Sequence, residues 1–163
     1  FFMLFNVVIT GSVNLIFTLI AMKIVDKVGR KKLMIAGSIG LTIIYAFIGT
    51  FYYMGFQGLP LLILIVTAIA CYAMTLAPVV WVILSEIFPN KIRGAAMAVS
   101  TFTLWVSNAL LAYLFPVINS GLEVYGSFWF FSIVCFLGFV FIHFRVKETK
   151  GKSLETIEKE WNL

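Results

Sequence analysis

Five apolar stretches dominate the sequence, and short segments holding most of the charged residues separate them. They cover roughly residues 1–25, 33–56, 59–88, 95–118 and 125–144. A bilayer core about 30 Å thick is crossed by about 20 helical residues, so each stretch is long enough to span it. Lipid offers the backbone no hydrogen-bond partners, and the short alternating segments of a barrel are absent from the sequence. The pattern therefore predicts an all-α membrane protein with five transmembrane helices.

The composition excludes several other classes of protein. Hydrophobic residues make up 62% of the 163 residues and charged residues 12%, whereas about 25% is usual in soluble domains. A chain of this length has too little interior to bury so much apolar surface. The composition therefore excludes four classes as the default interpretation: a soluble enzyme, a disordered chain, a disulfide scaffold and a nucleic-acid-binding protein. Cys71 and Cys135 lie in apolar stretches and are interpreted as small core residues.

The positions of the basic residues predict the orientation in the membrane. All 12 Lys and Arg residues lie in or beside the first and third connections or after the fifth stretch. Because basic residues accumulate on the cytoplasmic side, we expect a multi-pass protein of the cell membrane with a cytoplasmic C-terminus. The tail, residues 145–163, is expected to hold a short amphipathic helix capped by Ser153. The chain begins with Phe1 inside an apolar stretch, which we interpret as a piece of a longer protein that lacks its N-terminal half.

Polar and indole side chains lie deep within three of the stretches. Amides both donate and accept hydrogen bonds, and indole rings present flat apolar faces, so this combination suits a sugar. The alternative is that each amide joins two helices and each indole is packing. Deep within the stretches there is no cation for an anionic solute, and the sequence shows no metal-ligand cluster and no nucleotide motif, so we expect a neutral ligand and no cofactor. The candidate residues are Asn14, Trp81, Trp105 and Asn108.

A second group of candidates consists of charged residues at the cytoplasmic ends of the stretches. Glu86 lies at the inner end of the third stretch, where an unpaired carboxylate is costly to desolvate. Arg30 and Arg93 are both possible partners. A charged network that forms when the cytoplasmic side closes would act as a gate.

Several motifs resemble those of the sugar porter family of the major facilitator superfamily. The match covers essentially the whole chain, in order and spacing, and corresponds to segments 8–12 of twelve. The tenth-segment motif is specific, whereas the loop motif after the first stretch is shared more widely in the superfamily. The motifs are Gly11-Ser-Val-Asn14 with Asp26-Lys-Val-Gly29-Arg30, Pro78-Val-Val-Trp81 with Ser85-Glu86-Ile-Phe-Pro89, Trp105-Val-Ser-Asn108, and Glu148-Thr-Lys-Gly151.

The resemblance implies a twelve-helix fold in which two halves enclose the sugar and transport proceeds by alternating access. It implies sugar contacts at Asn14, Trp81 and Trp105, with Asn108 beside them. It also implies a charge network formed by Asp26, Arg30, Glu86, Arg93 and Glu148. Leu104 replaces a Gln or Asn that is common in the family, Ala77 replaces a Gly or Pro, and Lys147 replaces a Pro.

The resemblance therefore implies transport of a pentose or hexose such as D-xylose, with proton symport as the expected coupling. The acid that couples the proton would lie outside this chain. The alternatives are facilitated diffusion of a sugar or polyol, a non-transporting sugar sensor of the same fold, and an intramembrane enzyme. The expected partners are a neutral sugar, a proton, the lipid bilayer and the N-terminal half of the same protein.

Overall fold

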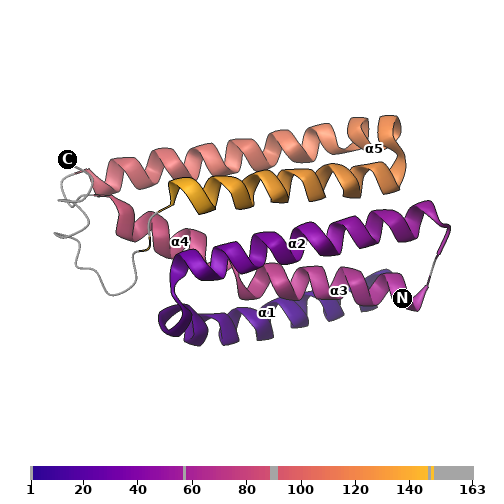
Figure 1. Ribbon diagram of the computed structural model, residues 1–163, viewed down its shortest axis with the longest axis horizontal. Coiled ribbons are helices and arrows are strands. Elements are labelled where there is room, and N and C mark those ends of the chain that lie inside the picture. Colours follow the sequence, from indigo (N-terminus) through magenta and orange to yellow (C-terminus); the bar gives the residue numbers. More distant parts are fainter. Residues whose placement is uncertain (1, 57, 89–91, 147, 149–163) are drawn as a thin grey trace.

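The computed structural model describes residues 2–56, 58–88, 92–146 and 148, with the backbone alone for residues 2–6 and 26. The described residues are almost entirely helical and none lies in a strand, so the predicted all-α class is confirmed. The predicted tail helix lies outside the described residues. The elements are α1 (Phe2–Val28), α2 (Arg30–Tyr53), α3 (Leu59–Met74), α4 (Leu76–Ile87) and α5 (Arg93–Arg145), which pack as an elongated bundle (Figure 1).

Helix α5 reverses direction at Glu123. A straight helix of 53 residues would be about 80 Å long, far more than a bilayer core. Glu123 has φ 58° and ψ 179°, a backbone conformation that is strained for a residue with a side chain. The helix folds back there into two antiparallel arms, which we call the first arm (residues 93–122) and the second arm (residues 124–145) (Figure 1). The turn is sharper than expected, since residues 119–122 are helical.

The third apolar stretch, predicted as one helix, contains two, α3 and α4. The break lies at Thr75 (φ −121°, ψ −73°), three residues before Pro78. Pro78 has no N–H for the carbonyl of Met74, and its ring crowds that carbonyl, so the distortion falls in the preceding turn. The Thr75 hydroxyl donates to the Cys71 carbonyl at 2.6 Å. Together α3 and α4 still form one apolar segment long enough to cross a membrane.

The break packs tightly against α2 at Gly37. Both Gly37 and Thr75 are buried, and a Cβ at Gly37 would overlap the Thr75 side chain. Small residues permit such close approach of helices in lipid. Contact with α2 therefore fixes the point from which α4 leaves α3, and with it the position of the side chains on α4.

The second arm of α5 packs against α2 and completes the bundle. The buried Ser132 hydroxyl donates to the Thr42 carbonyl at 2.7 Å, and the Tyr52 and Phe128 rings stack with centroids 5.6 Å apart. By length and composition, four segments of the described chain can cross a membrane, and the reversal at Glu123 divides the last of them. Many large apolar side chains on the outer faces remain exposed, as expected for a surface that meets lipid or another membrane segment. The segments are Val7–Val25, Arg30–Tyr53, Leu59–Ile87 and Arg93–Arg145.

Candidate functional site

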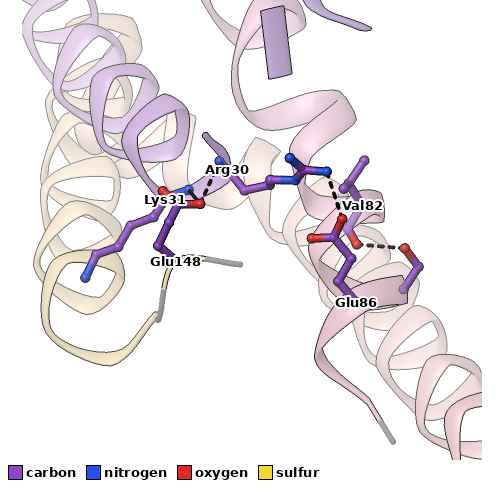
Figure 2. A network of polar contacts seen from close by, with 6 residues as sticks. Arg30, Lys31, Val82, Glu86 and Glu148 are labelled. Carbon is purple, nitrogen blue, oxygen red and sulfur yellow. Dashed lines mark hydrogen bonds and ion pairs between the residues drawn. The ribbon is translucent and has the colours of Figure 1, made fainter. Parts of the chain in front are cut away.

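A polar cluster joins three elements at the end of the bundle that holds the basic residues (Figure 2). Arg30, the first residue of α2, forms an ion pair with Glu86 near the end of α4, with 2.9 Å between Arg30 Nη2 and Glu86 Oε1. The two side chains are 14% and 24% exposed. Water therefore screens this pair less than it would a surface salt bridge, so the pair ties α4 to α2.

Glu148 follows α5 in the chain and caps the start of α2. Its Oε1 accepts from the backbone N–H of Arg30 at 3.0 Å and from that of Lys31 at 3.5 Å. The first N–H groups of a helix lack partners within the helix, and its positive end favours a carboxylate. Gly29 has φ +103°, and a Cβ there would lie 2.9 Å from Glu148 Oε2. A glycine at this position therefore makes room for the cap.

The structure brings together three of the five residues expected in the charge network: Arg30, Glu86 and Glu148. Of the two partners considered for Glu86, it places Arg30 in contact. Arg93 instead donates from Nε to the Phe88 carbonyl at 3.4 Å, and its buried Nη2 has no hydrogen bond within the described part of the chain. The side chain of Asp26 lies outside the described residues.

One further contact at this end was not expected from the sequence. The Lys31 ammonium donates to the His143 carbonyl at 2.9 Å and so joins α2 to the last turn of α5. Lys31 is one of the basic residues whose positions predict the orientation in the membrane. No local pattern reveals this contact, because the two residues are 112 positions apart.

A cavity of about 350 Å³ brings together three of the four residues expected to contact a sugar. It lies where α3 and α4 meet the first arm of α5. Trp81 and Trp105 are 45% and 58% exposed, so packing within this chain does not cover their rings. None of the described side chains that line this cavity is charged, so this wall suits a neutral ligand. The lining residues are Tyr72, Ala77, Val80, Trp81, Leu104, Trp105 and Asn108.

The fourth residue, Asn14, lines a neighbouring cavity of about 300 Å³. Its Oδ1 accepts from the Thr18 hydroxyl at 3.4 Å, a contact within α1 and not between helices. The rest of this cavity is mostly apolar, with side chains from α2, α3 and the second arm of α5. Asn14 therefore does not share a cavity with the two tryptophans. Tyr72 lines both cavities.

Tyr72 was not among the residues expected from the sequence to contact a sugar, and the reason is physical. It precedes Trp81 by nine residues, which is about two and a half turns of a regular helix. On an unbroken helix the two side chains would lie on opposite faces. The break at Thr75 lies between them and reorients α4 relative to α3, and both residues line one cavity. Only the position of the break could have revealed this, and it does not follow from Pro78 alone.

Comparison with known proteins agrees with this architecture. The family described as "Sugar (and other) transporter" matches residues 3–161. The arabinose-proton symporter of Bacillus subtilis is 40% identical over 154 residues, covering 94% of this chain and 33% of that protein. The D-xylose-proton symporter of Escherichia coli K12 is 39% identical over 164 residues, covering 97% and 33%. The glucose facilitated diffusion protein of Zymomonas mobilis is 38% identical over 157 residues, covering 93% of this chain and 33% of that protein.

Solved structures extend the agreement to the fold. The inward-open conformation of the xylose transporter XylE from E. coli matches with a TM-score of 0.90 and 38% identity. The match covers 96% of this chain and 35% of the transporter, and the chain spans about a third of the length of the curated relatives above. This family consists of transporters and not of enzymes. The chain is therefore part of a multi-pass membrane protein with the major facilitator fold, and it belongs to the sugar transporter family.

Proposed function

We propose that the protein of which this chain forms a part carries a neutral monosaccharide across the membrane by alternating access. The observation that carries the proposal is the uncharged cavity in which two exposed indole rings and an amide meet. A sugar ring places its C–H face on an aromatic ring, and its hydroxyls need both donors and acceptors. Trp81, Trp105 and Asn108 supply these groups on one side of the sugar. Asn14 contacts the sugar or its water shell from the neighbouring cavity.

Helix α4 is the element that couples this cavity to the cytoplasmic gate. Trp81 and Glu86 lie on the same short helix, five residues and about 7.5 Å apart along its axis. The helix begins at the break next to Thr75 and ends at the ion pair with Arg30. Movement of α4 about the break changes the sugar-binding wall and breaks the ion pair at the same time. Asp26 and Arg93 complete the network that steadies the closed cytoplasmic side.

The proposal includes proton-coupled symport of a pentose or hexose such as D-xylose. Two relatives whose names specify symport, of arabinose and of D-xylose, support the coupling and the class of sugar. The cavity wall described here has no titratable carboxylate, so the group that couples the proton lies elsewhere in the full protein. In this proposal the C-terminus is cytoplasmic, because the basic residues gather at that end. Facilitated diffusion of a sugar or polyol is the alternative, and a relative named for facilitated diffusion of glucose supports it.

Uptake of radiolabelled D-xylose and D-glucose by the full-length protein in proteoliposomes tests the proposal. We expect saturable uptake of at least one sugar, with accumulation above the outside concentration when a proton gradient is imposed. Equilibration without accumulation would contradict symport and support the facilitator alternative. Absence of saturable uptake of both sugars by correctly folded protein would contradict monosaccharide transport.

A further inference from the structure

We propose that the Tyr72 hydroxyl is a specificity-determining sugar contact that replaces the hydrogen bond which an amide at position 104 would provide. The inference rests on the proposed function and deepens it. Leu104 lines the cavity between α4 and the first arm, and its side chain neither donates nor accepts a hydrogen bond. Tyr72 lines the same cavity from α3.

The position of Tyr72 supports a role in binding. Tyr72 lines both the cavity of Trp81, Trp105 and Asn108 and the cavity of Asn14, so it is within reach of a ligand in either of them. Its side chain is 48% exposed although it lies within an apolar helix. In the described part of the chain it forms no ring–ring contact and its hydroxyl makes no hydrogen bond. A tyrosine kept for packing alone would cover its ring and satisfy its hydroxyl.

The Tyr72 hydroxyl adds a hydrogen-bond acceptor to a cavity wall that has few of them. The indole N–H groups of Trp81 and Trp105 can only donate hydrogen bonds, whereas sugar hydroxyls both donate and accept. The Asn108 amide provides one acceptor. The Tyr72 hydroxyl provides a second acceptor together with a donor, and it comes from α3 and not from the first arm of α5 that carries Asn108. Tyr72 therefore pairs with a sugar hydroxyl that Asn108 does not contact, and it selects ligands that carry a hydroxyl at that ring position.

The test uses the full-length protein and the Tyr72→Phe variant, which removes only the hydroxyl. We expect the Kd for D-xylose to rise about 2- to 12-fold, since one net hydrogen bond contributes about 0.5–1.5 kcal/mol. A series of D-xylose analogues that each lack one hydroxyl then identifies the sugar hydroxyl that Tyr72 contacts. The parent protein should bind one analogue more weakly than D-xylose, and Tyr72→Phe should bind D-xylose and that analogue equally well. A purely structural role would weaken binding of all the analogues by the same factor.

Two further variants keep the result interpretable. Tyr113→Phe removes a hydroxyl from an exposed tyrosine of the first arm that lines neither cavity, and it should leave the Kd unchanged. Leu104→Gln added to Tyr72→Phe should recover most of the lost affinity. An unchanged Kd in Tyr72→Phe, with normal binding by the parent, would overturn this inference alone. Absence of sugar binding by the folded parent protein would overturn the proposed function and this inference with it.

Discussion

Replacing Trp81 with alanine in the full-length protein is expected to raise the Kd for its sugar about 10- to 100-fold, with membrane insertion unchanged. Trp81 is 45% exposed and lines the cavity, so its loss removes the stacking face for the sugar and little of the packing of α4. A buried aromatic anchor at a binding site contributes about 2 kcal/mol or more, and about 1.4 kcal/mol corresponds to a factor of ten. Isothermal titration calorimetry of the purified protein with D-xylose measures the effect directly.

Trp129→Ala provides the matched control for the loss of an indole. Trp129 lies on the second arm, packs against Tyr53 and Tyr125, and lines none of the cavities described above. Its removal should lower the thermal stability of the bundle while leaving the Kd within about twofold of the parent, because it acts away from the sugar. An unchanged Kd in Trp81→Ala, or an equal rise in both variants, would show that Trp81 does not contact the sugar.

The Glu86→Gln substitution should raise the ratio of inward-open protein to protein with a closed cytoplasmic side about tenfold or more. The ion pair with Arg30 is mostly buried. Removing one partner of a fully buried ion pair destabilises the state that contains the pair by about 3–5 kcal/mol. That cost falls on the state in which the cytoplasmic side is closed, since the pair joins α2 and α4 only there in the proposed cycle. The equilibrium therefore moves away from the closed state.

Accessibility of a cysteine at the cytoplasmic end measures this shift. We expect faster maleimide labelling of an Ala95→Cys reporter in Glu86→Gln than in the parent, with Cys71 and Cys135 replaced by serine in both. Lys23→Gln removes a charge from an exposed side chain near the same end and should leave the labelling rate unchanged. Equal labelling rates in Glu86→Gln and in the parent would argue against a gate at this ion pair.

The sequence was sufficient to predict the helical class and the family. The apolar stretches are long and uniform, and the backbone in lipid has few alternatives to a helix. The tenth-segment motif from Pro78 to Pro89 is specific, and the family match over residues 3–161 confirms the resemblance it suggested. Both inferences depend on features that lie close together in the chain, so no knowledge of packing was needed.

The details that depend on packing could not be predicted in the same way. The break at Thr75 is set jointly by Pro78 and by the close contact with Gly37, which lies on another helix. The partner of Glu86 remained open between Arg30 and Arg93, because the relative positions of two helix ends follow from packing. Asn14 and Trp81 line different cavities, and this arrangement likewise depends on how α1, α3 and α5 pack together.

The central claim is that the sugar occupies the cavity between α4 and the first arm of α5, and protection of a cysteine at position 104 tests it most directly. The full-length Leu104→Cys variant, with Cys71 and Cys135 replaced by serine, is labelled with a maleimide at increasing D-xylose concentrations. The account predicts slower labelling with a half-effect near the Kd for the sugar, and no protection of a Tyr113→Cys control. A labelling rate at position 104 that stays constant while the same protein binds D-xylose would contradict the account.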